Sequence, residues 1–353
     1  MFIKRAFLIC IGLIVVQCTN SSKDIASHDI GKVEFTDLFY FEFERELPAK
    51  IPGVINSFNV NPSGDFIFSD VSTQYGWLYK NDSDSWHTLI IDDCHPGIEN
   101  SPLYLVFSDK HIFMTNNFNW VGYRFNMDGS CGGIFDDRFK LPTSITGLDE
   151  GFIGFTNELG DYTPLISKFD STGVSIYTVE NTTDPNPYYS YSVILGRGFV
   201  AINDSILLVV NVSSPELHYF NHIKGEFINK KSTPVPSIFK SVNHMFDEKR
   251  YKEIGFFHLN ELGDHMYVSQ VSLASDSTVL FYVPYMLTEE DDLIILQNIN
   301  NGNYVYTGLS KDGYKSYFLN RNELFVFDYD HNNTIMRKYN VNPEMIKKLK
   351  DSP

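Results

Sequence analysis

Short apolar runs rich in Val, Ile, Phe and Tyr alternate along this chain with short turns of Asn, Asp, Ser and Gly. In residues 199–211 (FVAINDSILLVVN), for example, two apolar, β-branched runs flank a polar turn. This pattern predicts an antiparallel β-hairpin. The same unit occurs six times, and its turns are centred on Asp65, Asp109, Glu150, Asp204, Asp276 and Asn322.

The spacing of these hairpins predicts the architecture. Successive turns lie 44, 41, 54, 72 and 46 residues apart, and a recurring β unit of about 40–50 residues is typical of a propeller blade of about four strands. A second pair of strands follows each of the first five hairpins, as in residues 77–80 and 86–91. We therefore predict an all-β fold, a six-bladed β-propeller with four-stranded antiparallel blades. The alternative is seven blades, with the longest step supplying a degenerate one.

The two ends of the chain are predicted to close the ring. The last hairpin is followed by one further strand, at residues 334–341, and then by Asn342-Pro343 and a short basic amphipathic tail. The last blade therefore lacks its fourth strand. Residues 33–44 partly alternate apolar and polar side chains, as a half-buried strand does. Pairing of this N-terminal strand with the last blade would remove the free edges of a split sheet.

The N-terminus carries the features of an export signal. A basic pair, Lys4-Arg5, precedes an apolar run at residues 6–16 and then Gln17-Cys18. An apolar core of this length behind basic residues is a secretory signal, too short to span a bilayer. The segment resembles a bacterial lipoprotein signal, in which the cysteine becomes the lipidated first residue, although Gln17 stands where a small residue is usual. The alternative is a plain secretory peptide with Cys18 at its boundary.

Charge and motifs narrow the function classes. The net charge is −16, which repels phosphate backbones and anionic lipid, so we expect no nucleic-acid partner and membrane contact through the lipid anchor only.

No G-x-S-x-G, P-loop or G-x-G-x-x-G motif is present, and we expect no cofactor. The D-x-D-x-N start at residues 328–332 lacks the later glycine and acid of a calcium loop, so a turn explains it better and no metal is expected. Catalytic residues remain unknown.

Two cysteines remain in the predicted mature body. Cys94 and Cys131 form a possible disulfide, which an export signal permits. Two free thiols are equally compatible with the sequence, because nothing in it brings the two Cα atoms together.

The longest step contains an insertion at about residues 231–264. It combines aromatic and charged residues, and we predict that Phe246, Arg250 and Tyr251 form a partner-binding loop, since aromatic anchors with charged neighbours are common at interfaces. The alternative is a loop that only covers an apolar face of the ring.

The leader, the six hairpins and the Asn-, Tyr- and Phe-rich composition together resemble the six-bladed β-propeller lipoproteins of Bacteroidetes, many of them TolB-like in fold and of unknown function. The resemblance covers about residues 30–345. It implies a bacterial cell-envelope location, as an outer-membrane lipoprotein on the periplasmic or surface face, and it assigns no catalytic residue.

These observations predict four segments: a signal peptide (1–17), a tether (18–31), the propeller (32–345) and a C-terminal tail (346–353). The predicted function is a binding or scaffolding propeller for a protein or glycan partner. The alternative is a hydrolase or lyase with its site in the central channel, which requires no contiguous motif because single residues from several blades can build it. Enzymatic activity is uncertain and the less favoured of the two.

We expect Cys18 to carry lipid as the first residue of the mature protein. Mass spectrometry of the mature N-terminus should show the acylated cysteine, and a Cys18→Ser variant should leave the membrane fraction. A Cys18→Ser variant that stays with the membrane as the wild type does would rule out the lipid anchor.

Overall fold

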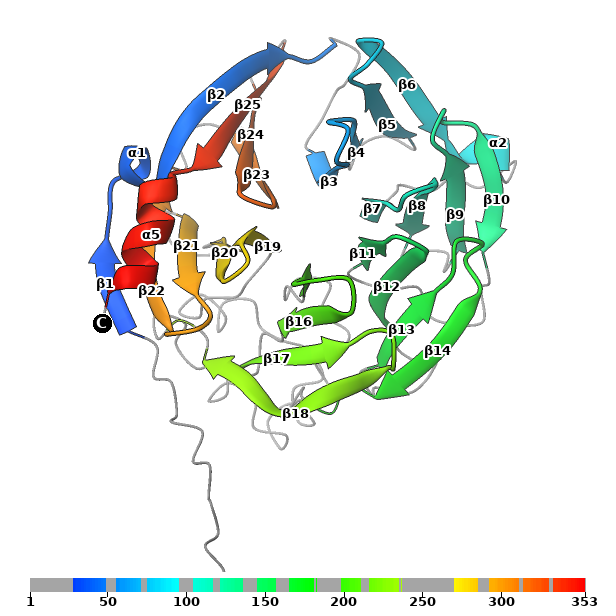
Figure 1. The fold of residues 1–353 in the computed structure, drawn as a ribbon. Helices are drawn as coiled ribbons and strands as arrows, with labels where there is room; N and C mark the ends of the chain where they lie inside the picture. Colours follow the sequence, from blue (N-terminus) through cyan, green and yellow to red (C-terminus); the bar gives the residue numbers. More distant parts are fainter. Residues whose placement is uncertain are drawn as a thin grey trace, which may run out of the picture.

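A computed structural model describes residues 28–48, 55–70, 75–94, 104–116, 121–135, 145–156, 165–180, 182, 198–210, 216–234, 236, 270–284, 292–310, 314–329 and 333–352. Within these ranges the strands form six sheets arranged around a central axis (Figure 1). The prediction of a six-bladed β-propeller with four-stranded antiparallel blades is confirmed, and the seven-bladed alternative is wrong.

Each of the first three blades is a four-stranded antiparallel meander that runs outward from the axis. Blade one contains β3 (Ile55–Val60), β4 (Phe66–Asp70), β5 (Tyr75–Lys80) and β6 (Ser85–Ile90). Blade two contains β7 (Tyr104–Phe107), β8 (His111–Asn116), β9 (Val121–Asn126) and β10 (Cys131–Phe135). Blade three contains β11 (Ile145–Leu148), β12 (Gly151–Thr156), β13 (Leu165–Phe169) and β14 (Ser175–Glu180).

The other three blades repeat this arrangement, and the two ends of the chain add to the last two. Blade four contains β15 (Gly198–Ala201), β16 (Ile206–Val210), β17 (Glu216–Asn221) and β18 (Glu226–Pro234). Blade five contains β19 (Gln270–Ser275), β20 (Thr278–Val283), β21 (Asp292–Asn298) and β22 (Asn303–Leu309), with β1 (His28–Lys32) at its outer edge. Blade six contains β23 (Tyr314–Asn320), β24 (Glu323–Tyr329) and β25 (Thr334–Val341), with β2 (Phe39–Glu46) outermost.

The strands are apolar on both sides because each blade is packed between two others. On β4, Phe66 and Phe68 belong to the cluster shared with blade six, whereas Ile67, between them, belongs to the cluster shared with blade two. The described residues form six such clusters of buried side chains, one at each junction between neighbouring blades. Burial on both faces explains the uninterrupted apolar runs, since a sheet with one face in water would alternate apolar and polar residues.

The N-terminal strand closes the ring as predicted. β2 pairs antiparallel with β25, from Phe39 opposite Val341 to Glu46 opposite Ile335. Lys338 on β25 adds an ion pair to Glu42 of β2, with 3.0 Å between its Nζ and the carboxylate. The last blade therefore joins residues from the two ends of the chain.

The strand starts later than the pattern of residues 33–44 indicated. A short helix, α1 (Phe35–Leu38), precedes it. Leu38 is fully buried in the cluster between blades five and six, and Phe35 packs against that cluster. Both side chains pack at the point where the chain crosses from blade five to blade six. The apolar and polar positions of residues 33–44 therefore belong to a helical turn followed by a strand, and not to one continuous strand.

The predicted tether overlaps with ordered structure. Residues 28–31, assigned to the tether, belong to β1, which pairs parallel with the outer strand β22 of blade five. β1 pairs with the outer edge of β22, whose N–H and C=O groups would otherwise lack partners within the sheet. The sequence DIGK lacks a strand alternation, so the pattern gave no signal for β1.

The C-terminal tail is a helix, α5 (Pro343–Asp351), that starts before the predicted boundary at residue 346. Asn342 caps it by accepting a hydrogen bond from the Glu344 amide at 3.1 Å. Met345 and Leu349 are buried in the cluster between blades five and six. In Figure 1 the helix lies beside β1, β21 and β22, so both ends of the chain cover the same part of the ring.

A disulfide joins the first two blades. Cys94, at the end of α2 (Ile91–Cys94), is bonded to Cys131 on β10, 37 positions further along the chain, with 5.3 Å between the Cα atoms. By the loop-entropy relation, a crosslink of this span stabilises the fold by about 4 kcal/mol.

Several predicted features lie outside the described residues. β18 extends to Pro234, into the insertion predicted at about residues 231–264, and residues 237–269 are not described. Cys18, Phe246, Arg250 and Tyr251 also lie outside the described residues. No helix in the described ranges combines the length and apolar character needed to cross a membrane.

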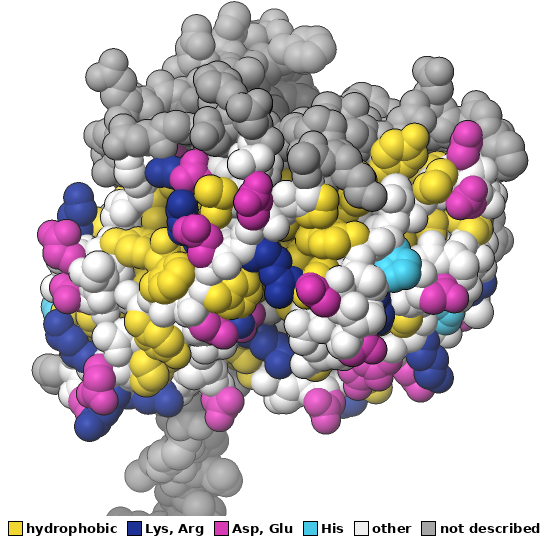
Figure 2. Space-filling view, turned by 90° about the horizontal axis from the view of Figure 1, so that it is seen from above, with side chains coloured by type: hydrophobic (Ala, Val, Ile, Leu, Met, Phe, Trp, Pro, Cys, Tyr) yellow, Lys and Arg dark blue, Asp and Glu magenta, His cyan; other side chains and the backbone are white. Residues whose placement is uncertain are grey.

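The outer rim of the ring is chemically mixed. Phe41 on β2 is 55% exposed and Ile176 on β14 is 54% exposed. On the side of the ring shown in Figure 2, hydrophobic side chains are interspersed with acidic and basic ones.

The turn of the first hairpin contains a buried carboxylate. Asp65 is 4% exposed and accepts hydrogen bonds from Lys80 Nζ at 2.7 Å, the Asn81 amide at 2.9 Å and Asn61 Nδ2 at 3.1 Å. Burial alone would raise the pKa of Asp65, but the hydrogen bonds from Lys80, Asn81 and Asn61 outweigh it and lower this pKa below its usual value.

We expect Asp65→Asn to lower the free energy of unfolding at pH 7 by about 2 kcal/mol, because Lys80 loses its charged partner. Because the pKa of Asp65 is lower in the folded protein than in the unfolded chain, where it is about 4, the Asp65 carboxylate stabilises the fold fully at pH values above 4. This stabilisation is lost as the pH falls through the pKa of Asp65 in the folded protein. Urea unfolding at pH 7, 5 and 3 should therefore show a difference between wild type and variant that narrows below pH 4.

The control is Asp109→Asn, at the exposed turn of blade two, which should change stability by less than about 0.5 kcal/mol. If Asp65→Asn lowered the free energy of unfolding by the same amount at every pH, the carboxylate charge of Asp65 would not be the cause of the stabilisation.

Candidate functional site

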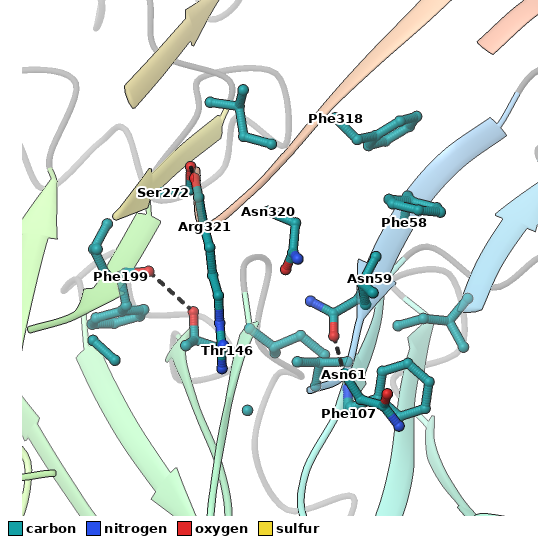
Figure 3. A pocket seen from close by; sticks show the side chains of 18 of the residues that line it. Phe58, Asn59, Asn61, Phe107, Thr146, Phe199, Ser272, Phe318, Asn320 and Arg321 are labelled. Atoms are coloured by element: carbon teal, nitrogen blue, oxygen red, sulfur yellow. Dashed lines mark hydrogen bonds between the residues drawn. The ribbon is translucent and has the colours of Figure 1, made fainter. Parts of the chain in front are cut away.

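The six innermost strands enclose a central channel. β3, β7, β11, β15, β19 and β23 each pair with one strand of their own blade and turn the other edge toward the axis. Residues from all six line one partly open cavity of about 1060 Å³ (Figure 3). Because residues of all six blades line this cavity, we take it as the candidate functional site.

Within the described residues, polar side chains bridge the inner strands at four of the six junctions between blades. From blade one, Ser57 Oγ accepts a hydrogen bond from the Leu105 amide at 3.0 Å, and Asn59 Oδ1 accepts one from the Phe107 amide at 3.2 Å. Unpaired backbone groups at an inner edge need such partners. These bonds fix the position of β7 relative to β3.

Gln270 bridges blades five and six in the same way. Its Oε1 accepts a hydrogen bond from the Leu319 amide at 2.8 Å, and its Nε2 donates one to the Tyr317 carbonyl at 2.7 Å. One amide side chain thus replaces two ladder bonds along the edge of β23.

The remaining junctions are held by a hydroxyl or by close backbone approach. Thr146 Oγ1 donates to the Phe199 carbonyl at 3.4 Å between blades three and four, the contact dashed in Figure 3, and Ser316 Oγ donates to the Ile55 carbonyl at 3.3 Å between blades six and one. A Cβ added to Gly147 would lie 1.7 Å from the carbonyl oxygen of Phe107, between blades two and three.

Between blades four and five, a Cβ added to Gly198 would lie 2.3 Å from Val271 Cγ1. Every junction therefore has a specific contact next to the channel, so the lining is held on rigid strands.

The charged residues that line the cavity lie at one end of it. Among the described lining residues these are Asp109, Asp149 and Arg321. Each lies in the turn between the first two strands of its blade. Since the first strands all run in the same direction along the axis, these turns share one end of the channel, which we call the turn end.

Arg321 has an unusual backbone conformation. Its φ is +52°, in the left-handed region that favours glycine. Ser272 Oγ of blade five donates a hydrogen bond to the Arg321 carbonyl at 2.7 Å and so holds the turn. The side chain is exposed, and in Figure 3 it extends from its turn across the opening of the channel. Within the described parts of the chain, its guanidinium has neither an ion pair nor a hydrogen bond.

Other amides at the channel are used by the fold. Asn61 Oδ1 accepts hydrogen bonds from the Ser63 and Asp65 amides at 2.9 Å each, and Asn320 Nδ2 donates to Glu323 Oε2 at 3.0 Å. In the described ranges no three His, Cys, Asp or Glu side chains are grouped to hold a metal ion. The described lining therefore offers hydrogen-bonding groups, two carboxylates and one free cation.

The site residues predicted from the sequence are not the residues that line the channel. Cys94 and Cys131 lie in α2 and in an outer strand, and the candidate loop residues are not described. Arg321, Asn59 and Ser272 were missed, although the turn Asn320-Arg321-Asn322 was recognised as the sixth hairpin turn. A basic residue at the centre of a hairpin turn was the available signal.

No protein-family model and no curated protein matches the chain. Its fold is similar to that of a DUF4221 family member from Bacteroides vulgatus, with a TM-score of 0.56, 10% identity and coverage of 86% of this chain and 98% of that one. Hydrazine synthase from Kuenenia stuttgartiensis has a TM-score of 0.51, 10% identity and coverage of 86% and 81%. Virginiamycin B lyase from Staphylococcus aureus has a TM-score of 0.50, 11% identity and coverage of 86% and 100%. Identities this low show the propeller fold alone.

We expect Gly147→Ala to lower the free energy of unfolding by about 1–3 kcal/mol, because the added methyl overlaps the Phe107 carbonyl and β11 must move away from β7. Chemical denaturation measures the change. Ser63→Ala, at an exposed turn that also borders the channel, is the control and should unfold like the wild type. A Gly147→Ala variant as stable as the wild type would show that these strands are not in close contact.

Proposed function

We propose that this protein is a binding β-propeller, anchored by lipid on Cys18 in the bacterial cell envelope, whose central channel takes part of a protein or glycan partner. The observation that carries the binding role is the cavity itself, about 1060 Å³ in volume and lined by the first strands of all six blades. Pockets that hold small molecules or parts of larger ones are of this order, about 300–1000 Å³.

The character of the lining supports binding. Binding sites on rigid elements keep their geometry, and here the six junction contacts hold the strands that carry the lining. Amides, hydroxyls and exposed strand edges present donors and acceptors along the channel, which suits recognition of a polar group through hydrogen bonds.

The envelope location rests on the leader and its resemblance to lipoprotein signals. β1 starts at His28, so the segment between Cys18 and the ring is short, at most about 3.5 Å per residue when extended. The ring would then stay close to the membrane that holds the lipid.

The hydrolase or lyase alternative stays a prediction that nothing in the described residues tests. One protein of similar fold is named virginiamycin B lyase, but at 11% identity the likeness carries no reaction to this chain.

The channel can be blocked to test the binding role. Ala201 and Ala274 line it in neighbouring blades, and a double Ala201→Trp, Ala274→Trp variant should fill the turn end. Wild type and variant are applied to arrays of glycans and peptides, with Ile176→Trp on the outer strand β14 as the control. We expect the wild type and the control to retain the same array members and the double variant to lose them.

Retention of the same members by the double variant would contradict binding in the channel. Circular dichroism melts of the three proteins distinguish this outcome from loss of the fold.

A further inference from the structure

Only two non-glycine residues in the described parts of the chain have a positive φ, Asp84 and Arg321. The side chain of Asp84 contributes to the fold, because its carboxylate accepts a hydrogen bond from the Tyr79 hydroxyl at 2.7 Å. The Arg321 side chain has no such contact within the described residues. A left-handed backbone is strained for any residue with a Cβ and free for glycine, so packing does not account for an arginine at this position.

Strain of this kind persists where surrounding contacts impose it, and it is common at ligand sites. Here the contact comes from the neighbouring blade, where the Ser272 hydroxyl holds the Arg321 carbonyl at 2.7 Å. The result is a guanidinium directed across the channel opening from a fixed turn (Figure 3).

A second donor points into the same space. The Asn59 side chain uses Oδ1 to accept the Phe107 amide at 3.2 Å, which sets the orientation of its amide group. Figure 3 shows its nitrogen directed into the cavity. Asn59 and Arg321 thus present N–H donors from the neighbouring blades one and six, and both line the cavity.

We propose that Arg321, with the Asn59 amide, makes the turn end of the channel a site for a carboxylate group of the ligand. A guanidinium presents two parallel N–H donors that match the two oxygens of a carboxylate or a phosphate. The nearby charges decide between these anions. Asp109 and Asp149 line the same end, and the whole chain carries −16, so a phosphate group of charge near −2 is repelled more strongly than a carboxylate of charge −1.

This inference rests on the proposed function, because it names the chemistry of the group that the channel takes. Uronic acids of glycans and the C-termini of peptides both supply a carboxylate. The probes distinguish these sources: trigalacturonic acid and its neutral methyl ester, and an acetylated tetrapeptide with a free carboxylate and its C-terminal amide.

Titration calorimetry of the full mature protein with the four probes tests the site. We expect at least one acid to bind the wild type at least about 10-fold more tightly than its neutral counterpart, and added salt to weaken it. Arg321→Gly should reduce that affinity about 10- to 100-fold, the effect of losing a charge-assisted pair of hydrogen bonds.

The same variant should fold at least as well as the wild type. Glycine relieves the left-handed strain, so the melting temperature should stay the same or rise by about 1–3 °C. Arg321→Asn provides a second loss of the guanidinium, since asparagine also tolerates this conformation. Lys110→Ala removes one positive charge from a residue that does not itself line the cavity, although its neighbours Ser108 and Asp109 do, and it should change affinity by less than about 2-fold.

Equal binding of each acid and its neutral counterpart, or wild-type affinity in Arg321→Gly, would overturn the carboxylate site. If array members are lost on blocking the channel while neither acid is preferred, the binding channel stands and the carboxylate assignment fails.

Discussion

The structure depends on how the six innermost strands satisfy their free edges while leaving the axis open. A strand edge without a partner leaves backbone donors and acceptors unpaired, and closing the channel with further strands would remove the cavity. In this chain, side chains of Ser57, Asn59 and Gln270 complete the backbone hydrogen bonding of the next blade. Glycines at 147 and 198 allow direct approach where no bridging side chain is used. Together with the apolar clusters between neighbouring blades, these contacts hold in place the strands that line the channel.

The second requirement is that the ring closes, and both ends of the chain contribute to this. β2 supplies the outer strand of blade six, β1 extends blade five, and α5 packs over the cluster between these blades. Lys338 bridges the closing strands, since its Nζ lies 3.0 Å from Glu42 of β2 and 2.6 Å from Glu323 of β24. Residues far apart in sequence thus pack together in blades five and six. They hold the ring closed at the place where its two ends meet.

The sequence predicted what depends on local pattern. Apolar runs around Asx turns located the six hairpins, and counting strands in the last unit located the closing strand. β1 was not predicted because its sequence does not alternate, whereas α1 was missed because its residues fall within the strand-like alternation of residues 33–44. The conformation of both elements follows from packing on blades five and six. The site was missed for a related reason. The left-handed φ of Arg321 and the hydroxyl of Ser272 that holds it come from different blades, and no spacing along the chain reveals their contact.

An N-terminal strand closes the ring that contains the channel. Hydrogen exchange of the full mature protein tests it directly, because amides in a closing strand open only with the sheet that holds them. Amides of Phe39–Glu46 that pair with β25 should exchange as slowly as those of β24, in the interior of the same blade. Exchange of these amides at the rate of an unpaired chain, while β24 stays protected, would contradict closure by this strand.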